Sequence, residues 1–135
     1  QLFYIPIFGQ YLMKHNMVAI DRTGKASAMR KMISSVKKKL DSGSTIIIFP
    51  EGTRKTPGEK PDYKTGFIGI YNTAKRKLQP VAVNSGLFWK KGLKIIKKGH
   101  IVIEFLPQIE IGLDKKEVLE KVEYSIESAT NKLLS

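Results

Sequence analysis

The stretch TIIIFPEGTR, residues 45–54, decides the fold expected for this chain of 135 residues. Residues 45–49 form a continuous apolar run rich in β-branched side chains, which is typical of a strand covered on both faces. Pro50 and Gly52 then interrupt the run. We therefore expect a central parallel strand that ends in a functional loop over residues 50–65, at its carboxyl end.

Helical and strand patterns alternate on both sides of this stretch. Apolar residues at helical spacing predict three amphipathic helices, over residues 26–40, 67–78 and 118–133. Short apolar runs predict further strands over residues 18–20, 81–83 and 100–106. This alternation predicts an α/β fold, a layered domain with a mostly parallel central sheet flanked by helices. We expect residues 1–135 to form one such domain.

Local signals set the expected ends of several elements. Gly43 is expected to stop the first helix. Asp114 and Glu117 have the spacing of a capping box at the start of the last one. Residues 88–99 are expected to form a hairpin with the strand over residues 100–106, turning near Lys98 and Gly99.

Composition excludes some kinds of chemistry and leaves others open. The chain has no cysteine, which excludes disulfides, thiolate catalysis and Cys-rich metal sites. Its formal net charge of +12 attracts nucleic acid, anionic lipid or phosphorylated small molecules, without choosing among them. No apolar run approaches the roughly 20 residues that a membrane-spanning helix needs. Because the chain starts at Gln1 and not at a methionine, we expect it to begin inside a longer polypeptide or to follow processing.

The end of the apolar run gathers groups that suit an anion. Gly52 allows backbone N–H groups to approach a ligand closely, Thr53 can donate a hydrogen bond, and Arg54 can bind two phosphate oxygens. Glu51 would orient Arg54 or a nearby donor. The alternative is a solvated turn in which Glu51 and Arg54 pair on the surface, contributing on the order of 0 to 1 kcal/mol.

The string FPEGTR, residues 49–54, resembles the signature of the glycerol-phosphate acyltransferase family, most closely the enzymes that acylate 1-acyl-sn-glycerol-3-phosphate. Residues 6–9 and 18–22 resemble the second block of the family, which implies that Arg22 helps to bind the phosphate of the acceptor. Residues 63–67 are similar to a basic segment that opens a helix, which implies the same role for Lys64. On composition alone, Arg22 could instead pair with Asp21, and Lys64 could be solvated.

Residues 79–85, QPVAVNS, resemble the fourth block of the family, a strand near the acyl-binding side. The resemblance implies that Pro80, Val81 and Asn84 belong to this acyl-side or structural block. The resemblance as a whole covers nearly the entire chain.

The first block of the family, a His-x-x-x-x-Asp segment that supplies the catalytic base, has no match in the chain. His15 has Ile20 five residues later, and His100 has Phe105 there. We therefore expect no catalytic residue in this chain, an N-terminally truncated domain, and no turnover without the absent block.

The resemblance implies an enzyme of phospholipid biosynthesis that converts lysophosphatidate to phosphatidate with an acyl thioester, acyl-CoA or acyl carrier protein, as co-substrate. It implies no metal and no other cofactor. The expected partners are lysophosphatidate, the acyl donor and an anionic membrane surface, at the cytoplasmic face of a membrane. The enzyme would be peripheral there, or anchored by a preceding segment.

A basic module without catalysis, binding nucleic acid or an anionic membrane, is the alternative. The charge and the aromatic pair Phe88 and Trp89 among lysines favour it. No recognisable nucleic-acid-binding motif accompanies them, so no nucleic acid is expected as a partner.

Overall fold

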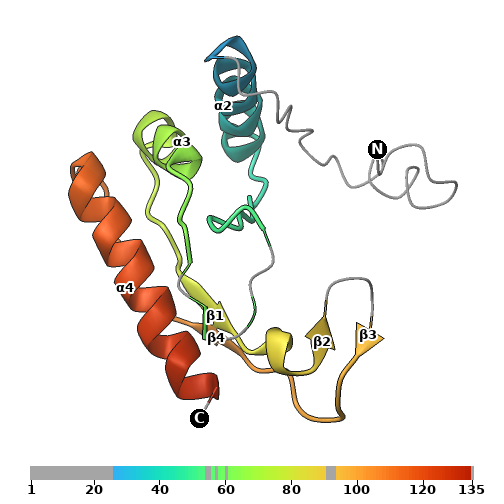
Figure 1. Ribbon diagram of the computed structural model, residues 1–135. Coiled ribbons are helices and arrows are strands. Elements are labelled where there is room, and N and C mark those ends of the chain that lie inside the picture. The colour runs from blue at the N-terminus through green and yellow to red at the C-terminus, as the bar shows by residue number, and fades with distance from the viewer. Residues whose placement is uncertain (1–25, 54–55, 57, 60, 91–93, 135) are drawn as a thin grey trace, which may run out of the picture. The chain divides into compact units, whose positions relative to one another are not determined.

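The structure is a computed structural model that describes residues 26–53, 56, 58–59, 61–90 and 94–134 (Figure 1). The chain divides into two compact units, Gln1–Ile46 and Ile47–Ser135, which are taken in turn below. The strand expected over residues 18–20 lies outside the described residues. The expectation of one domain stays a prediction.

In the first unit, helix α2 (Ala26–Asp41) confirms the helix predicted over residues 26–40. It ends as expected at Gly43, whose φ of +84° is a conformation that glycine adopts without a steric penalty. Beyond it, the Ser44 amide donates to the Lys39 carbonyl at 2.9 Å, which satisfies one of the last carbonyls of the helix. Lys37 pairs with Asp41 at 2.6 Å along the helix surface.

The apolar run over residues 45–49 is not a strand in the structure. It pairs with no other strand among the described residues, and the side chains of Ile47 and Phe49 are each 79% exposed. A strand needs neighbours to accept its ladder hydrogen bonds, and β-branched composition alone does not supply them. The mostly parallel sheet stays a prediction, because residues 1–25 carry another of its expected strands.

In the second unit, strand β1 (Val81–Val83) pairs antiparallel with β4 (Ile103–Phe105). These strands confirm the runs predicted over residues 81–83 and 100–106. The pairing extends beyond β1 and β4, because Leu78 and Ile109 exchange both backbone hydrogen bonds at 3.1 and 2.9 Å. Helix α4 (Lys115–Leu134) packs along β1 (Figure 1).

Helix α3 (Gly66–Ala74) is shorter than the helix predicted over residues 67–78. Lys75 has a left-handed φ of +48°, so the helix ends there, and its amide still donates to the Tyr71 carbonyl at 3.0 Å. Leu78 consequently leaves the helix and joins Ile109 in the antiparallel bridge.

The predicted capping box of α4 is confirmed in both directions. The Asp114 Oδ1 atom accepts from the amides of Lys116 at 2.7 Å and Glu117 at 2.9 Å. The Glu117 Oε2 atom accepts from the Asp114 amide at 3.2 Å. These bonds satisfy N–H groups that have no acceptor inside the helix.

The core of the second unit lies between α3, α4 and the bridge that follows β4. Val118 is fully buried at its centre. The other buried members are Tyr63, Phe67, Ile68, Tyr71, Ile109 and Val122. The polar atoms of Tyr71 are also satisfied, since its hydroxyl donates to the Glu110 carbonyl at 2.6 Å and accepts from the Leu113 amide at 3.1 Å.

The hairpin predicted to turn near Lys98 and Gly99 is placed differently. Strand β2 (Trp89–Lys90) pairs antiparallel with β3 (Lys94–Ile95), whereas β4 pairs with β1. A short 3-10 turn, η2 (Ser85–Leu87), precedes β2. Within the described ranges, no helix has the length and apolarity needed to cross a bilayer.

Candidate functional site

The loop between residue 50 and helix α3 is closed by backbone hydrogen bonds. The Gly52 amide donates to the Phe49 carbonyl at 3.1 Å, and the Lys64 amide donates to the Pro50 carbonyl at 2.8 Å. The second bond joins the two ends of the loop. The residues that follow the apolar run are therefore brought next to the residues that open α3.

Gly52 and Lys64, both predicted to bind phosphate, lie side by side. Gly52 has a φ of +66°, and a Cβ atom built on it would lie 3.3 Å from the Lys64 Cγ atom. The position therefore favours glycine twice, through its backbone conformation and through its contact with the lysine stem. Thr53 follows on the exposed surface of the same loop.

Lys64 also stands directly before the N-terminus of α3. Thr65 is the N-cap residue but makes no side-chain capping bond, and the first turn of α3 has no acidic residue. A helix N-terminus carries partial positive charge and N–H groups that no helical carbonyl accepts. Lys64 therefore adds a full positive charge to a partial one.

The Lys64 ammonium forms an ion pair with Asp62 in the structure. Both side chains are exposed, at 63% and 71%, so water competes with the pair and its contribution is about 0 to 1 kcal/mol. A phosphate dianion offers the ammonium a stronger partner than this exposed carboxylate, since charge-assisted bonds to phosphate are among the strong ones.

Tyr63 anchors the loop to α4 and was given no role by the sequence pattern. Its ring is buried, and its hydroxyl donates to the Glu127 Oε1 atom at 2.9 Å. Burial raises the pKa of the Tyr63 hydroxyl, and the hydrogen bond to Glu127 and the negative charges of Glu51 and Glu123 raise it further. Because Glu127 lies 64 residues later in the chain, no local pattern could have revealed this partner.

Glu51, predicted to orient a donor, is half-buried near Tyr63 and acts on its pKa. The structure thus gathers Glu51, Gly52 and Lys64 around one loop. Arg22 and Arg54, the other two predicted phosphate ligands, lie outside the described residues, as does His15.

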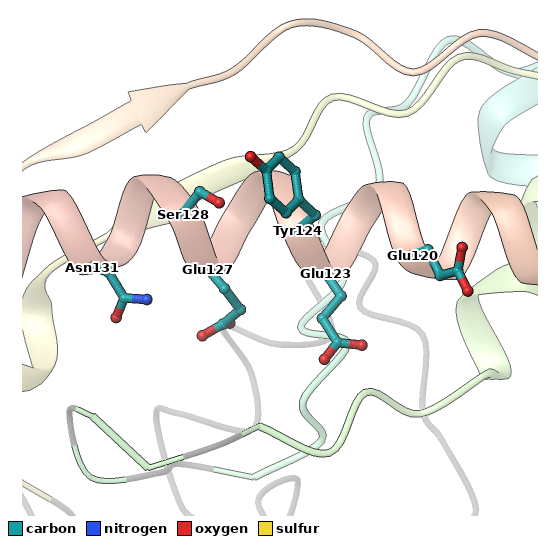
Figure 2. Close-up of a pocket in the computed structure, with 6 residues that line it drawn as sticks. All are labelled: Glu120, Glu123, Tyr124, Glu127, Ser128 and Asn131. Carbon is teal, nitrogen blue, oxygen red and sulfur yellow. The ribbon is translucent and has the colours of Figure 1, made fainter.

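An open hollow on α4 is acidic and therefore suits a phosphate poorly. It is lined by Glu120, Glu123, Tyr124, Glu127, Ser128 and Asn131. Figure 2 shows Glu123 and Glu127 on one side of the helix and Tyr124 on the other. Its carboxylates would repel an anion, so the loop with Lys64 is the better candidate.

Pro80, Val81 and Asn84 of the predicted acyl-side block fasten β1 to its neighbours. The Pro80 carbonyl accepts from the Leu106 amide at 3.0 Å, and Val81 stands opposite Phe105. Asn84 is buried, and its Oδ1 atom accepts from the Val102 amide at 2.8 Å. In the structure these residues have a supporting role in the sheet.

His100 is exposed, and its backbone carbonyl accepts from the Asn84 Nδ2 atom at 3.4 Å. Within the described ranges, no group of three His, Asp or Glu side chains is arranged to hold a metal ion.

Comparison with known proteins identifies a family that the chain matches. The family model described as Acyltransferase matches residues 1–84, well over half of the chain. A 1-acyl-sn-glycerol-3-phosphate acyltransferase of Helicobacter pylori is 38% identical over 96 residues, which cover 69% of this chain and 40% of the relative. No solved structure matches.

Two more relatives carry the same enzyme name. The protein of Pseudomonas aeruginosa is 32% identical over 91 residues, covering 67% of this chain and 35% of its own length. The protein of Limnanthes douglasii is 29% identical over 111 residues, covering 81% of this chain and 39% of its own length. The chain thus spans about two fifths of the length of these relatives.

Proposed function

Because the chain belongs to the acyltransferase family, we propose that it is the acceptor-binding part of an enzyme that acylates 1-acyl-sn-glycerol-3-phosphate. The acyl group comes from a thioester, on coenzyme A or acyl carrier protein, and the product is phosphatidate. The enzyme name shared by the relatives supports this acceptor.

The placement of Gly52 against Lys64 at the start of α3 carries the proposal. In the bound state, the ammonium of Lys64 leaves Asp62 and pairs with the phosphate, the hydroxyl of Thr53 donates to it, and the first amides of α3 face it. The family resemblance adds Arg22 and Arg54 to this set as further phosphate ligands.

Holding the phosphate fixes where the free hydroxyl of the acceptor lies. In the reaction, the hydroxyl oxygen forms a bond to the thioester carbonyl carbon, the carbon–sulfur bond breaks, and the hydroxyl proton ends on the thiol. A fixed phosphate converts the meeting of hydroxyl and carbonyl into an oriented encounter. The base for that proton is proposed to lie outside residues 1–135, because neither His15 nor His100 stands five residues before an aspartate.

Binding of a short-chain lysophosphatidate, kept monomeric in solution, tests the acceptor site directly. Lys64→Gln removes a charge-assisted bond and should weaken binding about 10- to 100-fold by calorimetry. Lys77→Gln is a matched control, because Lys77 is also exposed and ion-paired, with Glu110 at 2.6 Å. Equal losses in both variants, or no binding by the unaltered chain, would refute the site.

Turnover is tested separately. The 135-residue polypeptide is assayed for acyl transfer beside the same polypeptide extended at its N-terminus with the family's histidine–aspartate block. We expect activity only from the extended form. Appreciable activity from residues 1–135 would overturn the claim that the base lies elsewhere, while leaving the phosphate site standing.

A further inference from the structure

Positive charge is concentrated in the middle of the chain. Residues 63–103 contain no aspartate and no glutamate. The same stretch contains nine basic residues, Lys64, Lys75, Arg76, Lys77, Lys90, Lys91, Lys94, Lys97 and Lys98. Five of the nine fall between Phe88 and Gly99, so the densest positive charge lies around strands β2 and β3.

We call residues 88–90 and 94–99 the basic hairpin. Its strands are held by the pairing of Trp89 with Ile95, and the Ile96 amide donates to the Phe88 carbonyl at 2.8 Å. The Phe88 ring packs against Gly99, and the Lys97 Nζ atom lies 5.5 Å from the centroid of that ring. Phe88 therefore holds the two sides of the hairpin together.

The basic hairpin exposes apolar side chains beside its lysines. Trp89 is 49% exposed, Ile95 72% and Ile96 45%. Lys97 and Lys98, which follow directly, are exposed as well. A surface with an indole ring, branched aliphatic groups and ammonium groups is amphipathic, and it gains from a partner that is both apolar and anionic.

An anionic lipid bilayer is both apolar and anionic, with its charge at the surface and its apolar region beneath. Indole rings settle at the headgroup level, aliphatic side chains enter the acyl boundary, and lysines pair with anionic headgroups. A nucleic acid would satisfy the lysines and could stack on the tryptophan, but it would leave Ile95 and Ile96 in water. Charge complementarity and apolar exposure together therefore favour lipid.

We propose that the basic hairpin docks the protein onto an anionic lipid bilayer, with Trp89, Ile95 and Ile96 inserted and Lys97 and Lys98 on the headgroups. The inference rests on the proposed function in one respect, since a lipid acceptor reaches the phosphate site from such a surface. The docking surface and the phosphate site share no residue, so the two can fail independently.

Trp89 reports on docking directly, because it is the single tryptophan of the chain. The polypeptide is titrated with phosphatidylcholine vesicles, with and without phosphatidylglycerol, while its emission is recorded. We expect a blue shift only with the anionic vesicles, and quenching when their acyl chains are brominated. An unchanged spectrum, or no difference between the two vesicle types, would overturn the proposal.

Matched variants separate charge from apolar insertion in a vesicle sedimentation assay. Lys97→Gln and Lys98→Gln should each weaken partitioning about fivefold, whereas Lys115→Gln and Lys116→Gln on α4 should not. Ile95→Ser should weaken it, whereas Ile111→Ser, at an exposed site before α4, should not. Circular dichroism checks that each variant stays folded, and equal effects in variants and controls would count against docking by this surface.

Binding assays without vesicles distinguish the docking proposal from the proposed function. The variants Lys97→Gln and Lys98→Gln should bind short-chain lysophosphatidate as the unaltered chain does. Docking without lysophosphatidate binding would sink the proposed function alone, and binding without docking would sink only this inference. Tight binding of an oligonucleotide with no response to vesicles would also overturn docking, in favour of a nucleic-acid surface.

Discussion

The N-termini of α3 and α4 are finished in opposite ways. At α4, Asp114 and Glu117 bond reciprocally to backbone amides, so the N–H groups and the positive end of the helix dipole meet carboxylates of the protein itself. At α3, Thr65 makes no capping bond, no acidic residue occupies the first turn, and Lys64 stands beside it. One terminus is capped by side chains of the fold, while the other has no side-chain cap and lies beside the exposed Lys64–Asp62 ion pair.

In the proposed function, this difference separates a structural terminus from one that binds the phosphate. Capping stabilises a helix by supplying acceptors, and an open terminus forgoes that stabilisation. An incoming phosphate can supply the same acceptors and a negative charge. In the proposed function, the acceptor's phosphate does for α3 what Asp114 does for α4.

Replacing the left-handed glycine that precedes each helix, Gly52 before α3 and Gly112 before α4, should give the largest effects on stability and binding. In Gly52→Ala, the left-handed backbone costs about 1 to 2 kcal/mol, and the new methyl group displaces the stem of Lys64. Gly112→Ala, just before α4, has the same kind of backbone cost at a φ of +92° but meets nothing within 4 Å. Denaturant unfolding should show similar losses in both variants, and titration should show weakened lysophosphatidate binding only in Gly52→Ala. Normal binding by Gly52→Ala would break the comparison.

Removing the N-cap side chains should give an intermediate effect on stability. Asp114→Ala should lower the free energy of unfolding by about 1 kcal/mol, because two amides lose their acceptor. Thr65→Ala should cost clearly less, since no capping bond is lost. Thermal unfolding of the two variants sharpens the comparison, and a loss at Thr65 as large as that at Asp114 would show that α3 is capped after all.

The hydrogen bond that joins Tyr63, before α3, to Glu127 on α4 should give the smallest effect on stability, and this effect should appear at high pH. The folded state raises the pKa of Tyr63, whereas the unfolded chain releases that proton near pH 10. Stability from this group is therefore present below pH 10 and is lost as the pH rises above it, by a few tenths of a kcal/mol at pH 10 itself.

Denaturant unfolding between pH 8 and pH 10 measures this loss. Tyr63→Phe should remove it, and Tyr124→Phe, at an exposed site on α4, should retain it. If the two variants show the same pH dependence, Tyr63 does not stay protonated in the folded state.

The parts of the fold that the sequence predicted depend on local interactions. The stop at Gly43, the capping box at Asp114 and the strand over residues 81–83 each follow from neighbouring residues, and each is confirmed. The resemblance carried by residues 49–54 is also confirmed, through the family match. That string could be recognised because its glycine and charged residues are contiguous.

The parts that were missed depend on distant interactions. The run over residues 45–49 has the composition of a strand, but strand pairing depends on a neighbouring segment that these residues do not specify. The hairpin turn was misplaced because the packing of Phe88 on Gly99 and the pairing of Trp89 with Ile95 set the register. Of the predicted site, Gly52 and Lys64 are brought together. The binding roles of all six predicted residues stay predictions, those of Arg22, Glu51, Gly52, Thr53, Arg54 and Lys64.

The hydrogen bond from Tyr63 to Glu127 ties the loop between residue 50 and α3 to helix α4. The loop therefore depends on a part of the chain that the family match does not reach. That match ends at residue 84, whereas α4 begins at Lys115. The last turns of α4 thus hold the residues before α3 in place, although they lie far away in the sequence. Trimming the protein from its C-terminus past Glu127 should loosen the loop between residue 50 and α3 well before it removes any residue of the proposed phosphate site.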